Sequence, residues 1–400
     1  MKPDIKIKDL LQKKPKAVNF FKSIGFKNIE KENSPLRLLT LNSLANMKKI
    51  NVDTLISQLE EYLEIEENKA DITLLEQNKK GDITIAGVLP CPVRIPLLEK
   101  INEKIEEFEL SKNHQVNINL ESASKGLEWM KEIIDFDNPD TIPDISISAG
   151  FEFFLYEKSK KLIKKGFFED VVPTPLNSDF EDINLKDPYN ALSVFSVVPA
   201  IFMVNLEELN GREIPKSWKD LIFGDYENLV SIPVGDFDLF NSILIHIYAD
   251  YGEEGIERLQ KIMFTGLHPT VAVKTQQMKN SQKPAVTVMP YFFSRMVGNL
   301  QTVKIIWPED GAIISPIFAL VRKDKKDKIK PLTDALISKE VGEILSHRGL
   351  FPSLNPEVKN TLIEPGNFKW VGWNYLFENN VEELIIRLNK RFESLAGVVK

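Results

Sequence analysis

The sequence predicts an α/β protein with two lobes around a central cleft, preceded by a small all-α domain. Residues 7–67 space their apolar side chains at the period of helices. From Asp82 onward, short apolar runs alternate with amphipathic helices, an order typical of parallel βαβ units. The stretch Val171–Leu192, rich in Pro, Asn and Asp, divides this alternating part into two blocks. The chain is expected to build a first block, cross to a second block and return to the first. This order predicts two lobes joined by a hinge.

The composition excludes several classes of protein. With 400 residues, 43% of them hydrophobic and 27% charged, the chain is long enough for two or three globular domains, and neither disorder nor a collagen-like repeat fits. Residues 1–70 carry a formal charge of +3, from 13 basic and 10 acidic side chains, and residues 71–400 carry −10, from 38 and 48. Because phosphate neutralisation needs a basic excess, we expect no nucleic-acid partner.

The amino-terminal part is predicted to be a helical bundle over residues 1–68. Its helical pattern is interrupted at four places that favour turns or helix ends, namely Pro15, Gly25, Ser34-Pro35 and Asn51. These breaks predict three to five short helices. The charged residues that follow have no apolar face to bury, so we expect a linker over 69–81.

The first lobe is expected to comprise about 82–178 and 300–400 of the two-lobed part, which is 82–400. Its first three strands, each followed by a helix, are predicted from apolar runs and amphipathic periods at Ile83–Val88, Leu97–Phe108, Val116–Leu120, Gly126–Ile134, Asp144–Ser148 and Glu152–Lys165. The returning strands and helices are predicted at Val303–Trp307, Ile317–Arg322, Leu332–Ser346 and Val381–Leu395. Ligands of such sheets bind at the carboxyl ends of the strands.

The second lobe is expected over about 190–292. Its elements are predicted at Val194–Asn205, Trp218–Ile222, Leu229–Pro233, Phe237–Tyr251, Glu253–Met263 and Ala285–Met289. The longest uncharged apolar stretch, Ala191–Val204, contains Pro199 and is shorter than the roughly 20 residues that a membrane-spanning helix needs. It is predicted to form a buried strand pair or a crossing segment, and no membrane span is expected.

The sequence predicts a cytoplasmic location. Residues 1–21 scatter charged side chains throughout and contain no apolar block of the kind found in secretory signals. The single cysteine, Cys91, cannot form an internal disulfide, which is compatible with a reducing compartment. A periplasmic or cell-surface location is the alternative if a signal has been removed.

Three phrases in the two-lobed part resemble a known family. Glu213–Leu221 (EIPKSWKDL) with Val230–Pro233, then Trp307–Gly311 (WPEDG) through Ser315-Pro316, and His347–Pro352 (HRGLFP) occur in the family's order. They resemble the type II periplasmic solute-binding proteins of ABC transporters, in the iron(III), thiamine, phosphonate and polyamine branch. The resemblance covers roughly residues 82–360. It implies a periplasmic-binding-protein-like II fold with a central ligand cleft and an ABC permease as a partner.

The amino-terminal part resembles a second family. The pattern from Leu10 to Phe26 is similar to a small helical domain of unknown function found in anaerobic bacteria. That resemblance implies no activity, although the domain could serve a protein partner. The chain also departs from the iron-binding relatives, which have adjacent tyrosines where this sequence has Tyr291 followed by Phe292. One tyrosine in place of two puts octahedral iron(III) binding in doubt.

Candidate ligand-binding residues lie first in the Leu89–Pro96 segment (LPCPVRIP). Helix N-terminal amides after it favour an anion. Cys91 is a candidate thiol or metal ligand, with Arg94 three positions away to lower its pKa. Packing as a small hydrophobe is the alternative for Cys91.

The other strand ends of the first lobe offer further candidates. Ser122, Ser124 and Ser148 can donate hydroxyl hydrogen bonds to a ligand, or act as helix N-caps. Gly150 lies at the third strand end. Ser315 belongs to the returning segment that resembles the family.

In the second lobe, Asp236 and Phe237 form a strand-to-helix turn that faces the first lobe in this fold. Asp236 and Asp238 would weaken anion binding and favour a cation or amine, and helix N-capping explains both residues equally well. Tyr291 follows a strand and is expected to wall the cleft. Cys91, Asp236 and Tyr291 are the candidates for a bound metal ion, because the four histidines show no metal-binding spacing.

These observations favour a binding protein over an enzyme. The sequence has no Walker loop, G-x-S-x-G elbow or C-x-x-C pair. We expect a non-catalytic cytoplasmic protein whose two lobes close over a small polar ligand or metal ion. An exported receptor of an ABC importer for iron or an organic solute is the first alternative. The second is a redox-linked interaction module that uses Cys91.

Overall fold

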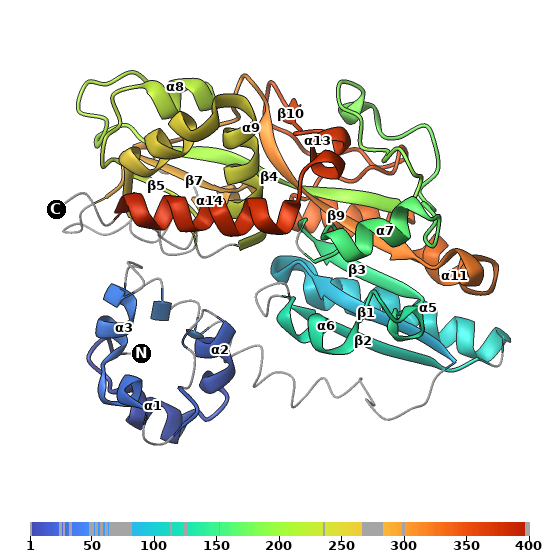
Figure 1. The fold of residues 1–400 in the computed structure, drawn as a ribbon. Coiled ribbons are helices and arrows are strands. Elements are labelled where there is room, and N and C mark those ends of the chain that lie inside the picture. Colours follow the sequence, from blue (N-terminus) through green and yellow to red (C-terminus); the bar gives the residue numbers. More distant parts are fainter. Residues whose placement is uncertain are drawn as a thin grey trace.

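The computed structural model describes most of the chain (Figure 1). The described residues are 2–23, 26, 29–31, 34–47, 52, 55, 56, 59, 60, 63, 82–112, 114–122, 127–151, 153–234, 237–265, 283–297 and 301–396. Within them, no helix is both long enough and apolar enough to cross a membrane.

The amino-terminal part is all-helical, as predicted. It contains α1 (Ile7–Lys13), α2 (Ala17–Ser23), the 3₁₀ turn η1 (Pro35–Leu38) and α3 (Leu41–Met47). Their apolar faces form a hydrophobic core separate from that of the remaining chain. Within this small domain, Arg37 of η1 donates a hydrogen bond from Nε to the carbonyl oxygen of Ile29 at 3.0 Å.

The rest of the described chain is built around one mixed sheet in the order β2-β1-β3-β9-β4-β7-β5-β6, with β10 beside β9 and β8 beside β4. The strands are β1 (Ile83–Leu89), β2 (Val116–Ser122), β3 (Ile145–Ala149), β4 (Leu192–Asn205), β5 (Val230–Ser231), β6 (Met263–Thr265), β7 (Val286–Pro290), β8 (Val303–Ile306), β9 (Ala312–Val321) and β10 (Phe368–Lys369). The α/β class and the two-lobed organisation predicted from the sequence are confirmed.

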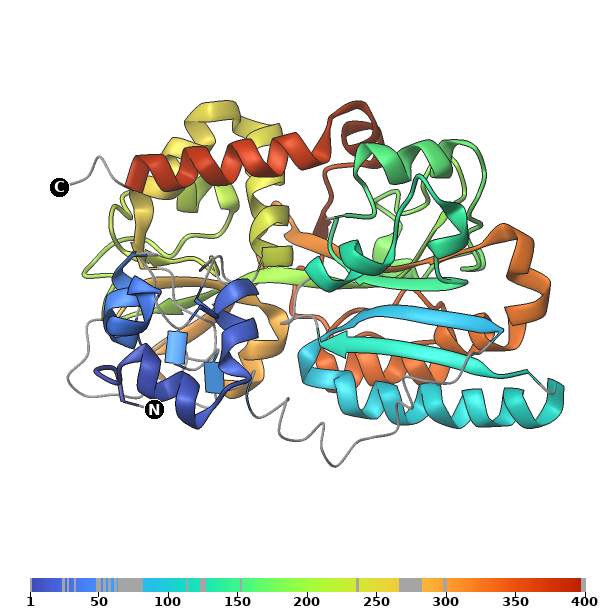
Figure 2. The same cartoon turned by 60° about the horizontal axis from the view of Figure 1, so that its bottom comes forward.

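Helices and short helical turns cover both halves of this sheet (Figures 1 and 2). They are η2 (Cys91–Val93), α5 (Arg94–Lys112), α6 (Glu128–Ile133), η4 (Pro139–Thr141), α7 (Glu157–Lys164), η5 (Ser178–Phe180), α8 (Trp218–Phe223), α9 (Phe237–Ile262), η6 (Tyr291–Met296), η7 (Lys323–Lys325), α11 (Lys326–Leu336), α12 (Lys339–Glu343), η8 (Ile344–Arg348), α13 (Trp373–Glu378) and α14 (Val381–Ala396). The two helices predicted on either side of Gly252 form α9, which is kinked at that glycine (φ 60°).

Two long strands join the lobes. β4 pairs with β9 over Leu192–Pro199 and then with β7 over Ala200–Val204, so a single strand passes from the first half of the sheet to the second. β9 pairs in turn with β3 of the first lobe. Pro199 lies at the changeover, where the loss of its N–H matters least. The apolar stretch predicted as a strand pair or crossing segment is therefore one crossing strand.

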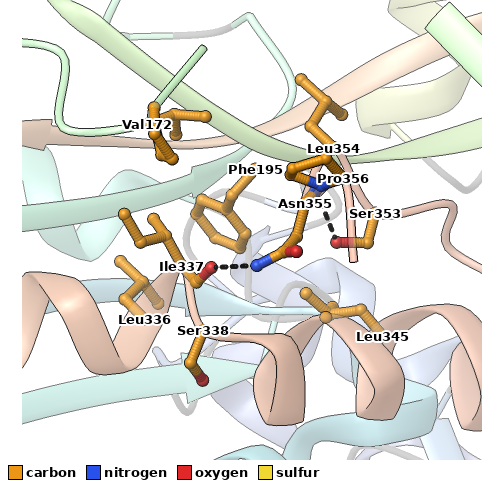
Figure 3. A pocket seen from close by; sticks show the side chains of 12 residues that line it. Val172, Phe195, Leu336, Ile337, Ser338, Leu345, Ser353, Leu354, Asn355 and Pro356 are labelled. Carbon is orange, nitrogen blue, oxygen red and sulfur yellow. Dashed lines mark hydrogen bonds between the residues drawn. The ribbon is translucent and has the colours of Figure 1, made fainter. Parts of the chain in front are cut away.

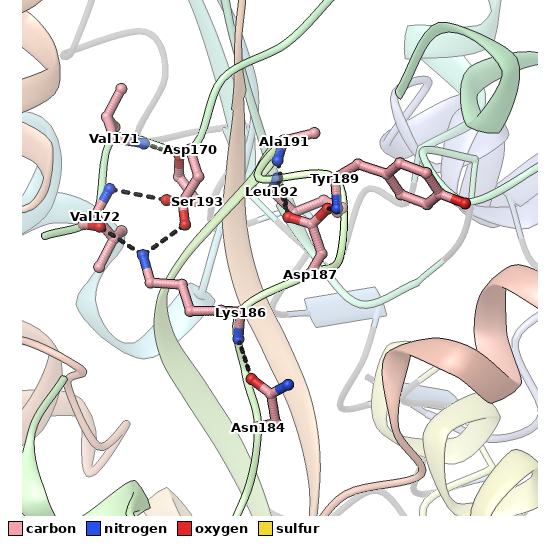
Figure 4. Close-up of polar contacts among 10 residues, drawn as sticks. All are labelled: Asp170, Val171, Val172, Asn184, Lys186, Asp187, Tyr189, Ala191, Leu192 and Ser193. Carbon is pink, nitrogen blue, oxygen red and sulfur yellow. Dashed lines mark hydrogen bonds and ion pairs between the residues drawn. The ribbon is translucent and has the colours of Figure 1, made fainter. Parts of the chain in front are cut away.

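The entrance to β4 is fixed by buried polar contacts (Figure 4). Lys186 Nζ donates to Asp170 Oδ2 and to the carbonyl oxygen of Val172, both at 2.5 Å. Asp187 Oδ2 accepts from the amides of Ala191 and Leu192, both at 2.8 Å. These bonds hold the crossing segment against the first lobe where the hinge strand begins.

Two segments expected in the first lobe lie with the second instead. β8 pairs with the distal half of β4, beside Phe202 and Val204. The helical tail, α14, packs along α9, where Phe392 meets Phe240 at a ring-centroid distance of 5.3 Å. The expected assignment of all of 300–400 to the first lobe is wrong for these segments, because the apolar face of α14 is buried against a second-lobe helix.

Candidate functional site

The lobes contact one another beside the hinge strands. Gly150, which follows β3, donates its amide hydrogen to the carbonyl oxygen of Pro316 in β9 at 2.8 Å. A Cβ atom added to Gly150 would lie 2.9 Å from Asp238 Oδ1, in the first turn of α9. Gly150 has a φ of 103°, a backbone conformation that residues other than glycine rarely adopt. The end of β3 and the beginning of α9 therefore meet across the boundary between the lobes.

Small hydroxyl side chains line this meeting point. Ser242 of α9 donates from Oγ to the carbonyl oxygen of Ile314 in β9 at 2.6 Å. Ser148 is fully buried and donates to the carbonyl oxygen of Gly150 at 3.5 Å. The buried hydroxyl of Ser315 has no hydrogen-bond partner among the described residues. The predicted site residues Ser148, Gly150 and Ser315 are thus brought to one region, around the middle of β9.

The Leu89–Pro96 segment is helical rather than an open loop. η2 follows β1 directly, and the 19-residue helix α5 begins at Arg94. Arg94 is half-buried, and its buried Nε has no partner in the described part of the chain. A guanidinium at the first turn of a long helix adds its charge to the helix dipole, which favours an anionic group there.

Five predicted residues cannot be placed fully. Ser124 and Asp236 lie outside the described residues, and so do the side chains of Cys91, Ser122 and Phe237. The backbones of these last three lie at the start of η2, the end of β2 and the start of α9. Their ligand-binding roles, like those of the placed residues, stay predictions.

Two of the sequence phrases interlock in the second lobe. Ser217 and Asp220 form a reciprocal capping box at the start of α8. The amide of Trp218 donates to Asp310 Oδ1 at 3.0 Å, and its indole Nε1 donates to the carbonyl oxygen of Gly311 at 3.1 Å. Burial raises the pKa of Asp310, and the hydrogen bond from Trp218 opposes that shift. The SWKD and PEDG phrases are therefore two sides of one packed contact.

The third phrase docks on the hinge. The amide of Val197 in β4 donates to the carbonyl oxygen of Pro352 at 3.1 Å, and Ser196 Oγ donates to that of Phe351 at 3.0 Å. The turn before them contains Leu350 at a φ of 49°. The HRGLFP phrase thus fixes the first-lobe side of the crossing strand.

A family model described as bacterial extracellular solute-binding protein matches residues 140–379, which is more than half of the chain. The chain belongs to this family. A second model, a domain of unknown function (DUF1858), matches residues 1–56. Both resemblances predicted from the sequence are confirmed. No curated protein matches the sequence.

Solved structures of solute-binding proteins share the fold. The ferric binding protein from Campylobacter jejuni has 15% sequence identity and a TM-score of 0.54, over 78% of this chain and 99% of that one. The apo ferric ion-binding protein A from Pasteurella haemolytica has 11% sequence identity and a TM-score of 0.56, over 80% of this chain and 99% of that one. AfuA from Actinobacillus pleuropneumoniae, with fructose-6-phosphate bound, has 15% sequence identity and a TM-score of 0.50, over 80% of this chain and 100% of that one. At such low sequence identity, structural similarity establishes the fold alone.

Within this solute-binding fold, Tyr291 is turned into the protein. Its side chain is 3% exposed and packs edge-on against Trp307 at a centroid distance of 5.2 Å. Burial raises the pKa of the phenol, which disfavours the tyrosinate that an iron ligand requires. No group of three or more His, Cys, Asp or Glu side chains that could hold a metal ion occurs among the described residues.

Two residues near the site were not among the predicted ones. Arg295 meets the end of η8, and His246 is buried in α9. Asp238, which was predicted with Asp236 to favour a cation or amine, is the residue that meets Gly150. Arg295 has no sequence signal, since its partners are backbone carbonyl groups, which every residue possesses.

A small pocket lies elsewhere in the first lobe (Figure 3). Its lining is mostly apolar and comprises Val172, Pro173, Phe195, Leu336, Ile337, Ser338, Gly342, Leu345, Ser353, Leu354, Asn355 and Pro356. The amide of Asn355 is already occupied, because Nδ2 donates to the carbonyl oxygen of Ile337 at 2.9 Å. This pocket therefore does not suit a polar solute.

Proposed function

We propose that the chain is a non-catalytic receptor that closes two lobes over a small polar solute. The contact of Gly150 with Asp238 beside the hinge strands carries this proposal, because it brings a first-lobe strand end against a second-lobe helix start. Ligands of α/β folds bind at such strand ends. Membership of the solute-binding family supports the same function.

The solute is proposed to carry an anionic group. Arg94 is half-buried at the start of α5, and its Nε lacks a partner among the described residues. A phosphate or carboxylate would supply the missing acceptor and would be favoured by the helix dipole. A similar structure, AfuA, contains fructose-6-phosphate, and others are named as ferric binding proteins. Because Tyr291 is buried and its pKa is raised, an organic anion is favoured over iron(III) as the solute. A metal ion bound together with the anion is compatible with this proposal.

Calorimetric titration tests this function. The purified chain is titrated with fructose 6-phosphate, orthophosphate, spermidine, thiamine and ferric citrate. We expect an anionic probe to bind, and Arg94→Gln to weaken it about tenfold, the loss of one charge-assisted hydrogen bond. Arg258→Gln is the matched control, because Arg258 is an exposed arginine of α9 paired with Glu254. Absence of binding for every probe contradicts the proposal.

The compartment is a separate proposal. The family description, extracellular, favours an exported receptor that delivers its solute to an ABC permease. The cytoplasmic location predicted from the sequence would instead make the chain an intracellular sensor. Cell fractionation of the native host with an antibody against the chain decides between them. Alkylation of Cys91 under native conditions tests the redox alternative, which requires fast labelling.

A further inference from the structure

Arg295 of the second lobe holds the end of a helical turn in the first lobe. Its Nη1 donates to the carbonyl oxygen of Arg348 at 2.9 Å, and its Nη2 donates to that of His347. Arg295 belongs to η6, which continues directly from β7. His347 and Arg348 end η8, whose following residues are bonded to the first-lobe half of β4. The two hydrogen bonds therefore cross from one lobe to the other.

The acceptors of Arg295 are groups that need a donor. η8 is a turn of π-helix, an element that often marks functional sites. The last carbonyl groups of a helix lack partners within it and carry the negative end of the dipole, so a guanidinium is a favourable partner. Phe292, also in η6, stacks on Phe351 at a centroid distance of 6.4 Å and an angle of 22°. Polar contacts thus join η6 to η8, and an aromatic contact joins η6 to the segment that follows η8.

η8 also touches the segment that leads to Arg94. A Cβ atom added to Gly349 would lie 2.9 Å from Val93 Cγ1, so the end of η8 and η2 are packed closely. Val93 ends η2, and Arg94 is the next residue. A continuous path of contacts therefore runs from Arg295, through η8, to the proposed ligand-binding residue.

We propose that Arg295 is a positioning residue for solute binding, which latches the closed lobes and fixes the Leu89–Pro96 segment through η8. The proposal rests on the proposed function, because a latch matters only if the lobes open and close. Ordering the Leu89–Pro96 segment during binding would reduce the net binding free energy. If Arg295 already holds the segment in place, this cost is avoided. Arg295 thereby raises solute affinity without touching the solute.

Small-angle scattering and calorimetry test the latch on the full chain. The radius of gyration is measured without a ligand for the wild type, Arg295→Gln, Arg295→Lys and the control Arg258→Gln. We expect Arg295→Gln to have the larger radius and Arg258→Gln to match the wild type. With fructose 6-phosphate and ferric citrate as probes, we expect Arg295→Gln to raise Kd about tenfold, the value of roughly one charged hydrogen bond, and Arg295→Lys to recover part of it.

The outcomes separate the latch from the proposed function. If neither probe binds the wild type but Arg295→Gln still has the larger radius of gyration, the proposed solute class is contradicted and the role of Arg295 in holding the lobes together is supported. If Arg295→Gln keeps both the radius and the Kd of the wild type, the latch is overturned. A fall in Tm of Arg295→Gln with no change in radius also overturns it, because that result describes a merely structural contact.

Discussion

His246 is a fully buried titratable residue on the central helix of the second lobe. Its Nδ1 donates to the carbonyl oxygen of Ser242 at 2.7 Å, and its Nε2 has no partner among the described residues. Its ring lies 6.1 Å from that of Trp370. Its pKa is lowered to about 4, chiefly by burial and in part by the charge of Lys369, while the hydrogen bond to Ser242 and the charge of Asp250 oppose the shift. The imidazole is therefore neutral in the folded protein at neutral pH.

This burial predicts an acid-sensitive stability. Below a pH of about 6.5 His246 takes up a proton in the unfolded chain but stays neutral in the folded protein. Protonation therefore favours the unfolded state, so the contribution of neutral His246 to stability is complete above pH 6.5 and is lost as the pH falls towards 4. The loss amounts to about 3 kcal/mol for a shift of this size. Urea unfolding at pH 7, 5.5 and 4.5 measures it. We expect His246→Leu to flatten the slope with pH.

A neighbouring substitution controls for packing. Ile245→Val removes one buried methyl group from the same helix and should cost about 1 kcal/mol at every pH. If His246→Leu and the wild type lose stability with the same pH dependence, the side chain does not titrate as its burial requires.

At the scale of elements, α14 is held on α9 by apolar and charged contacts of different value. Phe392 is 3% exposed and packs against Phe240. Arg387 Nη1 lies 2.8 Å from Glu253 Oε1, where both side chains are about half exposed. Burial of an aromatic ring stabilises far more than an exposed ion pair does. The apolar contact should therefore dominate the attachment of α14.

Two substitutions separate these contributions. Phe392→Ala leaves a cavity and should lower the free energy of unfolding by about 3–5 kcal/mol. Glu253→Gln removes the exposed ion pairs with Arg387 and Arg391 and should cost at most about 1 kcal/mol. Both are measured by urea denaturation at neutral pH. Equal losses for the two variants would show that charge, and not burial, holds the tail.

The elements themselves were largely predictable from the sequence. The apolar runs and helical periods from Ile83 to Lys165 match β1 to α7 within a few residues, because burial on one or both faces leaves a local pattern. The break expected at Gly252 is the kink of α9. The destination of α14 was not predictable, since an amphipathic pattern shows that a face is buried but not which surface covers it.

The candidate site was predictable to a lesser extent. Strand ends locate Gly150 and Arg94, because topology places such ends on one edge of a sheet. Side-chain direction is decided by packing, and Tyr291 points at Trp307 for that reason. The bond from Arg295 to residues 347 and 348 spans more than fifty positions. It uses carbonyl acceptors that leave no mark in a sequence.

At the scale of the molecule, two strands and one close contact govern the relation of the lobes. β4 pairs with β9 in the first half of the sheet and with β7 in the second, so bending about β4 is expected to change the separation of the lobes. Gly150 and Asp238 approach so closely that no side chain fits between them. This closeness makes Gly150 the position where the smallest substitution should separate the lobes.

Gly150→Ala tests that geometry against a matched glycine. Gly166 also has a positive φ, 71°, but a Cβ atom there meets nothing within 4 Å. Both substitutions strain the backbone, at a cost of about 1–3 kcal/mol, and both should lower Tm. Gly150→Ala alone inserts a methyl group against Asp238, so we expect it to enlarge the radius of gyration in small-angle scattering and to weaken solute binding about tenfold or more. Equal radii for the two variants would mean that the lobes do not close at Gly150.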